Sequence, residues 1–289
     1  MFNFGVDSLI WSEDFSEKDL WIIPKAKELG FDAIDINISN PFSFPTKQVR
    51  EKVAEVGIEP VTSFGLDKKS NTLSPDPEVR ANGVKVLKKV IDVNVELGSK
   101  IMGGIPYGAW GYLTGKPRTE QEWEWSVIAM REAAEYAKDK SDELVIAVEA
   151  VNRFETHFLN IAEDAVKYCK DVGTGNMGVH LDSFHMIREE ESFRKAVETC
   201  GKEYLGYVHV CESNRGIPGT GLVPWKEFLS AIKDVGYSGP CVIESFDPSF
   251  EKINMLCAIW RKFADSGEEL AIKGLKNLRA IAKEIESAG

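Results

Sequence analysis

Cysteine and histidine are scarce in this chain. It has five cysteines and four histidines among 289 residues, and no two cysteines have the Cys-x-x-Cys spacing. Disulfides staple small secreted domains, whereas a chain of this length can bury a sufficient core without them. An odd number of cysteines also leaves at least one of them unpaired. We therefore expect reduced thiols.

Long apolar runs and excess positive charge are also lacking. No uninterrupted apolar stretch reaches the roughly 18 residues of a membrane-spanning helix, and residues 1–5 do not begin a secretory signal. We expect a cytoplasmic protein with no membrane partner. The 35 basic and 46 acidic residues give a net charge of −11. This charge repels polyphosphates, so no nucleic acid partner is expected.

No Pro/Ser-rich linker, low-complexity tract or shift in composition divides the chain, so we expect one domain over residues 1–289. Strand-like and helix-like patterns alternate along it. Eight strands that are each followed by a helix predict a single (β/α)8 TIM barrel, an α/β fold. The predicted strands are residues 4–10, 33–38, 59–64, 100–105, 143–151, 177–182, 204–211 and 239–246.

Glycines and longer segments support this count. Apolar residues recur at helical spacing in residues 77–97 and 120–138. We expect left-handed helix caps at the glycines that separate helical patterns from strands. These are Gly30, Gly57, Gly98, Gly201 and Gly236. We also expect an extended loop after the fourth strand, at residues 106–112, as a lid or pocket wall, and a C-terminal helical extension from about residue 251.

Charged side chains lie at or near the carboxyl ends of the last four predicted strands: Glu149, Asp182, His209 and Glu244. A charge at the end of an apolar strand is costly to bury alone, so four of them at the spacing of a βα unit indicate one shared ligand. Oxygen and imidazole donors suit Mn²⁺, Mg²⁺ or Co²⁺. The sequence therefore predicts one open, catalytic site for a divalent metal ion.

Two further residues lie near this predicted site. His180 precedes Asp182 by two positions, so we expect it one layer deeper, as a core or supporting histidine. Cys211 lies on the predicted inward face with Tyr207 and His209. A ligand role is open to it, but we interpret it as a small buried hydrophobe.

The position of the two glutamates suggests proton chemistry. Glu149 and Glu244 come from strands five and eight, so a substrate on the metal would have a carboxylate on each side. A metal ion stabilises the enediolate that forms when a proton leaves the carbon next to a carbonyl. If one carboxylate removes that proton and the other returns one to the opposite face, the carbon is inverted. The sequence thus predicts an isomerase with Glu149 and Glu244 as its catalytic pair.

Four segments of the chain resemble the ketose 3-epimerases, which include D-tagatose 3-epimerase and D-allulose (D-psicose) 3-epimerase and belong to the xylose isomerase-like TIM barrel superfamily. The segments read EAVNRFET at 149–156, HLDSFHM at 180–186, HVCESNRG at 209–216 and VIESF at 242–246. Their order matches the family pattern, and the similarity extends along the whole chain.

This resemblance implies inversion at C3 of free ketoses, such as D-tagatose, D-fructose, D-allulose or L-ribulose, through a cis-enediolate. It implies one Mn²⁺, Co²⁺ or Mg²⁺ on the four ligands above, and a homodimer or homotetramer. It also implies a set of substrate contacts, with a protonated His185 as one donor. These contacts are Glu155, His185 and Arg215 to O1, O2 and O3, Trp110 and Phe246 as an apolar wall, and Gly65 as a residue that leaves room for the sugar.

Several alternatives remain open at the level of sequence. The glycine-rich residues 216–221 next to Arg215 could grip a phosphate, which keeps a pentulose-phosphate 3-epimerase in consideration. A hydroxypyruvate isomerase is a related possibility. A metal-dependent hydrolase like the AP endonucleases would need more histidines and a less acidic chain. A sugar-binding regulator would need an effector domain, and no segment suggests one.

Overall fold

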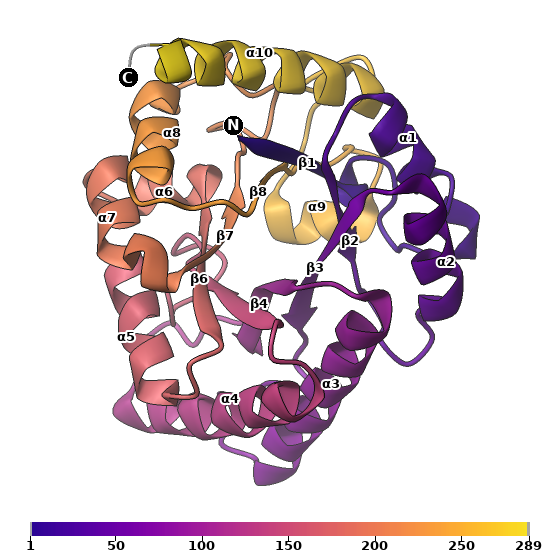
Figure 1. Ribbon diagram of the computed structural model, residues 1–289. Helices are drawn as coiled ribbons and strands as arrows, with labels where there is room; N and C mark the ends of the chain where they lie inside the picture. The colour runs from indigo at the N-terminus through magenta and orange to yellow at the C-terminus, as the bar shows by residue number, and fades with distance from the viewer. Residues whose placement is uncertain (1, 288–289) are drawn as a thin grey trace.

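Eight parallel strands close into a barrel in chain order, so the predicted (β/α)8 fold is confirmed (Figure 1). The computed structural model describes residues 2–287. The strands are β1 Asn3–Asp7, β2 Ala33–Asn37, β3 Glu59–Leu66, β4 Ile101–Ala109, β5 Val145–Glu149, β6 Met177–Asp182, β7 Leu205–His209 and β8 Pro240–Ile243. Strand β1 pairs with β8, from Asn3 opposite Pro240 to Val6 opposite Ile243, which completes the circle.

An outer layer of helices covers the barrel. The helices are α1 Ile22–Glu28, α2 Thr46–Val56, α3 Pro77–Leu97, α4 Glu120–Lys140, α5 Ala162–Val172, α6 Ser183–Glu189, α7 Phe193–Tyr204, α8 Trp225–Asp234, α9 Glu251–Cys257 and α10 Gly267–Ser287, with 3-10 helices η1 Ser8–Ile10 and η2 Glu17–Asp19. None of the helices within residues 2–287 combines the length and apolar character needed to cross a membrane.

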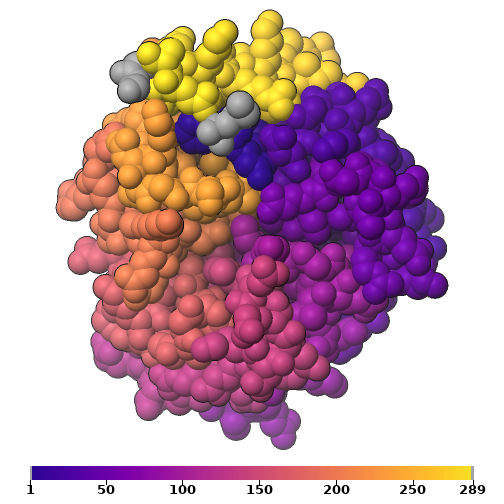
Figure 2. Space-filling model, viewed as in Figure 1, coloured from indigo at the N-terminus to yellow at the C-terminus, as the bar shows by residue number. Residues whose placement is uncertain are grey.

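The carboxyl-terminal extension has two parts with different positions. Helix α10 lies beside α8 and, in Figure 1, spans the edge of the barrel from α8 to α1, so it closes the helical ring. In Figure 2 the indigo amino-terminal segment lies between this yellow helix and the orange segment before it. Helix α9 contributes Ile253 and Cys257 to a small apolar cluster with Leu9 and Phe246, against which Trp110 packs. This cluster places α9 at the end of the barrel that holds the charged strand ends.

Several strand boundaries differ from the sequence prediction, which made β5, β7 and β8 too long and β3 too short. For β1 and β4 the structure gives the reason. Strand β1 stops at Asp7 because its carboxylate accepts the Leu9 N–H at 2.7 Å and starts the turn of η1. Strand β4 continues to Ala109, so the first four residues of the predicted loop at 106–112 are strand. Side chains from outside the sheet hold this part, since Thr72 and Ser126 both donate to the Tyr107 carbonyl.

The predicted glycine caps are correct in part. Gly57 and Gly98 end α2 and α3 in the left-handed conformation. Gly30 and Gly236 also have positive φ. Gly201 was predicted wrongly, because its ψ of −170° takes the backbone out of the helix instead of into a left-handed cap.

Candidate active site

The four charged residues singled out in the sequence lie where predicted. Glu149, Asp182 and His209 are the last residues of β5, β6 and β7, and Glu244 directly follows β8. Ligand atoms of Asp182, His209, Cys211 and Glu244 all lie within 4.8 Å of one another. Glu149 lies within the same distance of Asp182 in one group and of His209 in another. The barrel therefore gathers these side chains into one buried acidic and imidazole cluster that could hold a metal ion.

Arg215 places a positive charge inside this cluster. Its Nη1 atom donates to Asp182 Oδ2 at 2.7 Å and also to Glu244 Oε2. The guanidinium lies between the rings of Phe184 and Phe246, at 4.0 and 5.2 Å from their centroids. Arg215 is one of the non-glycine residues with positive φ, at 62°. A strained backbone and two aromatic faces thus hold a buried cation against two carboxylates.

Asp35, which the sequence analysis did not single out, holds the ring of His209 in place. The ring's Nε2 atom lies 3.3 Å from Asp35 Oδ2, while its Nδ1 atom has no hydrogen-bond partner and lies 3.5 Å from Glu244 Oε2. The same Asp35 oxygen accepts hydrogen bonds from Ser63 and, at 2.5 Å, from the Tyr207 hydroxyl. Asp35 orients the imidazole so that its free nitrogen faces the cluster.

His185 turns one ring nitrogen towards the same cluster. Its Nδ1 accepts the backbone N–H of Asn152 at 3.0 Å, and its Nε2 lies 3.2 Å from Arg215 Nη2 and 3.5 Å from Glu149 Oε1. Burial, and then the charge of Arg215, lower the pKa of His185 well below its usual value. The expectation of a protonated His185 was therefore wrong, because a buried ring beside a guanidinium disfavours a second positive charge.

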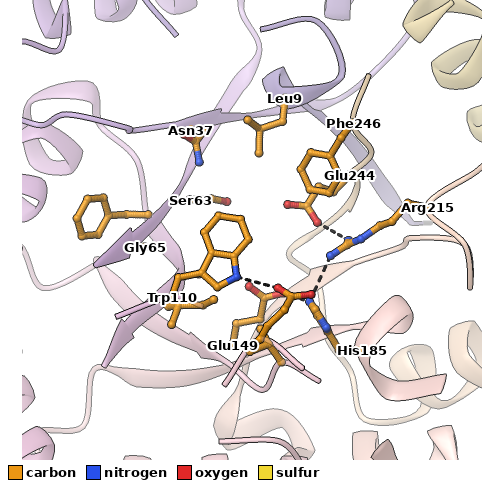
Figure 3. Close-up of a pocket in the computed structure, with 15 residues that line it drawn as sticks. Leu9, Asn37, Ser63, Gly65, Trp110, Glu149, His185, Arg215, Glu244 and Phe246 are labelled. Atoms are coloured by element: carbon orange, nitrogen blue, oxygen red, sulfur yellow. Dashed lines mark hydrogen bonds and ion pairs between the residues drawn. The ribbon is translucent and has the colours of Figure 1, made fainter. Parts of the chain in front are cut away.

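A cavity opens above the cluster (Figure 3). All six residues that the resemblance assigned to the substrate line it, together with Glu149 and Glu244. Figure 3 shows Glu244 and Phe246 on one side, Gly65 on the other, and Glu149 and His185 below. Further lining residues that the sequence did not indicate are Leu9, Asn37, Ser63, Phe64, Gly104, Ile105 and Val151.

Trp110 and Glu155 form one hydrogen-bonded wall of this cavity, and Asn152 supports the Glu155 carboxylate. Trp110 Nε1 donates to Glu155 Oε2 at 2.8 Å, and Asn152 Nδ2 donates to Glu155 Oε1 at 2.8 Å. Burial raises the pKa of Glu155. The carboxylate is thus held in place by two side chains while it faces the cavity. Gly65 lies beside Trp110, and a methyl group there would touch only this side chain, at 3.6 Å.

Comparisons with known proteins place this chain in a family. Residues 23–281 match the xylose isomerase-like TIM barrel family. The ketose 3-epimerase of Arthrobacter globiformis is 34% identical over 92% of both chains, and the L-ribulose 3-epimerase of Methylomonas sp. is 34% identical over 96% of both. The chain belongs to the ketose 3-epimerase family. A crystal structure of D-allulose 3-epimerase from Methylomonas sp. in complex with D-allulose is 32% identical and has a TM-score of 0.91 over 96% of both chains. The predicted family and the predicted enzyme class, an isomerase, are confirmed.

The two glutamates of this family member have opposite electrostatic environments. Burial, and then the charges of Asp182 and Glu244, raise the pKa of Glu149 well above its usual value. Burial also acts to raise the pKa of Glu244, but Arg215 and His209 outweigh it and lower that pKa to about 2. The two pKa values shift in opposite directions because the Arg215 guanidinium contacts Glu244 directly.

The glycine-rich residues 216–221 wrap around a buried carboxylate. Glu212 accepts hydrogen bonds from the backbone N–H of Gly219 at 3.0 Å, from Ser213 at 2.7 Å and from Trp225 Nε1 at 3.1 Å. The N–H of Gly216 is taken by the Asn214 side chain at 2.8 Å. These backbone donors, which a phosphate would require, are already engaged within the loop.

Proposed function

We propose that this chain is a metal-dependent epimerase that inverts C3 of a free ketose, such as D-allulose, D-fructose, D-tagatose or L-ribulose. The observation that carries the proposal is the pair of carboxylates, Glu149 and Glu244, which line one cavity and share Asp182 and His209 as neighbours. Inversion requires one proton-transferring group on each face of the carbon, and this arrangement supplies two.

The cluster fits a divalent metal ion. Its donors are carboxylate oxygens and one imidazole nitrogen, His209 Nδ1, which is buried and has no hydrogen-bond partner. A positively charged nitrogen of Arg215 already lies between Asp182 and Glu244. We assign Glu149, Asp182, His209 and Glu244 as the ligands of one Mn²⁺, Co²⁺ or Mg²⁺. When bound, such an ion stabilises negative charge that develops on the substrate oxygens.

The chain's own residues then divide the chemistry between them. One of Glu149 and Glu244 removes the proton at C3, which leaves a cis-enediolate, and the other returns a proton to the opposite face. Arg215 and His185 contact the ketose oxygens among O1, O2 and O3, with Arg215 as a donor, and Glu155 accepts from a hydroxyl there. Trp110 and Phe246 form the apolar wall, and Gly65 leaves room beside Trp110.

A free sugar is favoured over a phosphorylated one. The glycine-rich loop is the segment from which a phosphate site was considered, and its Gly216 and Gly219 amides are bonded internally. The lining of the cavity adds no lysine, and Arg215 already contacts two carboxylates.

We also propose a homodimer or a homotetramer. Phe154 and Trp260 are each 72% exposed and line a groove that shares Glu155 with the cavity. Exposed aromatic side chains around one groove are typical of protein interfaces. Replacing both with glutamate should shift the sedimentation coefficient to that of a monomer, whereas Leu222→Glu, at an equally exposed position, should not. An unchanged assembly in the double variant would exclude this surface.

The deciding experiment follows a panel of free ketoses and ketose phosphates in deuterated water with added Mn²⁺. The wild type should form C3 epimers that carry deuterium at C3. Glu149→Gln and Glu244→Gln should each lower turnover about a thousandfold, within the range for a lost proton-transfer group. Glu122→Gln, a buried glutamate outside the cavity, is the control. Epimerisation that survives either cavity substitution would exclude the two-carboxylate mechanism.

A further inference from the structure

The buried acidic and imidazole cluster also contains a sulfur atom. The sequence analysis interpreted Cys211 as a small buried hydrophobe, yet its Sγ lies within 4.8 Å of ligand atoms of Asp182, His209 and Glu244. Among residues 2–287, no other cysteine belongs to such a group. The other four cysteines are buried too, so burial alone does not distinguish Cys211 from them. Cys211 differs from them in the charged side chains that surround it.

Three of the four members of this group contact the same positively charged nitrogen. Arg215 Nη1 lies 2.7 Å from Asp182 Oδ2, 3.0 Å from Cys211 Sγ, and in hydrogen-bond contact with Glu244 Oε2. The fourth member, His209, has its buried Nδ1 without a partner and 3.5 Å from the same Glu244 oxygen. Two carboxylates and a sulfur thus surround one point that a cation already occupies, and a buried imidazole nitrogen lies beside one of these carboxylates.

Hydrogen bonds to its backbone hold Cys211 in this position. Ser183 Oγ accepts the Cys211 N–H at 2.8 Å and donates to the Cys211 carbonyl at 2.7 Å. Ser183 begins α6 and directly follows Asp182, so the strand that presents one carboxylate also fixes the residue that presents the sulfur. A side chain supported in this way needs little reorganisation to act as a ligand.

We propose that Cys211 is a sulfur ligand of the metal ion and biases the site towards softer divalent ions. The proposal rests on the metal site of the proposed function and deepens it. Thiolate ligands favour Co²⁺ and Zn²⁺ over Mn²⁺ and Mg²⁺, which prefer oxygen. The thiol loses its proton to solvent as the S–metal bond forms, and the Arg215 nitrogen that contacts the sulfur gives up its position to the ion.

Cobalt(II) provides a probe that does not depend on activity. Metal-free protein is titrated with Co²⁺, and the near-ultraviolet absorption band of a cobalt–thiolate bond is followed together with the weaker visible bands of the ion. Mn²⁺ affinity is measured in parallel by calorimetry. The variants are Cys211→Ala and Cys211→Ser, with Cys241→Ala as the matched control, because Cys241 is a buried strand cysteine that packs in the outer hydrophobic core.

The expected result is a thiolate band in the wild type and in Cys241→Ala, and its loss in both Cys211 variants. Removing the sulfur should also lower the ratio of Co²⁺ to Mn²⁺ affinity by roughly tenfold. Co²⁺ that binds with visible bands but without the thiolate band in the wild type would overturn the proposal and leave the proposed metal site intact. Absence of any Co²⁺ and Mn²⁺ binding would overturn both.

Discussion

The two halves of the barrel contribute different chemistry to the same cavity. Strands β5 to β7 end in Glu149, Asp182 and His209, Glu244 directly follows β8, and the loop after β7 adds Arg215. Strands β1 to β4 and the segments that follow them contribute mainly uncharged groups to the cavity. These are Leu9, Asn37, Ser63, Phe64, Gly65, Gly104, Ile105 and Trp110. The half with β5 to β8 supplies the charged groups, and the half with β1 to β4 shapes the cavity.

The uncharged half still supports the charged one. Asp35 on β2 reaches across the barrel interior to His209 on β7, and Trp110 after β4 donates to Glu155 after β5. Both links join an anion to a partner from the opposite half. Substitutions in the charged half should therefore change metal binding and proton transfer, whereas those in the uncharged half should change positioning and fit.

The largest effect on metal binding is expected from Asp182→Asn. Asp182 is fully buried and belongs to two of the metal-ligand groups, so loss of its charge removes a donor from the centre of the cluster. Mn²⁺ affinity, measured by calorimetry on metal-free protein, should fall about 100-fold or more. Asn37→Ala, which removes a cavity-lining amide from the uncharged half, should leave the affinity unchanged. Equal losses in both variants would contradict the division between the halves.

Glu212→Gln should destabilise the charged half without touching the cavity. One carboxylate oxygen accepts from both Gly219 N and Trp225 Nε1, and an amide cannot accept through its nitrogen. Buried donors left without an acceptor cost about 1–3 kcal/mol, so urea unfolding should report a loss of about 2 kcal/mol at neutral pH. Glu191→Gln, at an exposed position, is the control.

The loss of stability expected for Glu212→Gln should depend on pH. Hydrogen bonds from Ser213 and Trp225 outweigh the effect of burial and lower the pKa of Glu212 from its usual 4.5 in the folded protein. A group whose pKa falls on folding contributes stability that is full above its unfolded pKa and is lost as the pH falls through its folded pKa. The gap in stability between wild type and Glu212→Gln should therefore narrow below pH 4.5. A stability difference that stays the same at low pH would contradict a stabilising role for the Glu212 carboxylate.

The sequence predicted the fold and the strand ends because both follow from local patterns. Apolar strands that end in Glu149, Asp182 and His209 can be read from alternation, and parallel strands in a barrel bring their carboxyl ends together. Asp35 was missed because only strand ends were searched for charge. Its signal was available, since a carboxylate between Ile34 and Ile36 in a strand is as costly to bury as one at the end.

Other features depend on side-chain directions that no local pattern records. Arg215 has a left-handed backbone conformation in a long loop. This conformation places its guanidinium between Phe184 and Phe246 and its Nη1 beside Cys211. The neutral state of His185 follows from one backbone N–H donated by Asn152. These contacts are set by the tertiary structure and could not be predicted from spacing.

Trp110→Phe tests the link from the uncharged half to Glu155. Phenylalanine keeps the apolar wall but removes the N–H that holds the carboxylate at 2.8 Å. A hydrogen bond to a charged group contributes about 1.5 kcal/mol, so kcat/KM for the preferred ketose should fall about tenfold. Trp123→Phe removes an equivalent indole bond to Asp171 on the helical layer and should not change kcat/KM. Identical kinetics in both variants would show that Glu155 needs no fixed orientation.

The smallest effect is expected from Gly65→Ala, which tests whether the uncharged half sets the fit of the sugar. The new methyl group would lie 3.6 Å from Trp110, an ordinary contact, so stability should change by less than about 0.5 kcal/mol. Because the methyl enters the cavity, KM should rise about threefold while kcat is preserved. Gly57→Ala is the opposite case, since its φ of 66° disfavours a side chain but no atom lies nearby. It should lower stability by about 1 kcal/mol and leave KM unchanged. If KM does not change in Gly65→Ala, the substrate does not approach this part of β3, and the shape of the cavity is set by Trp110 instead.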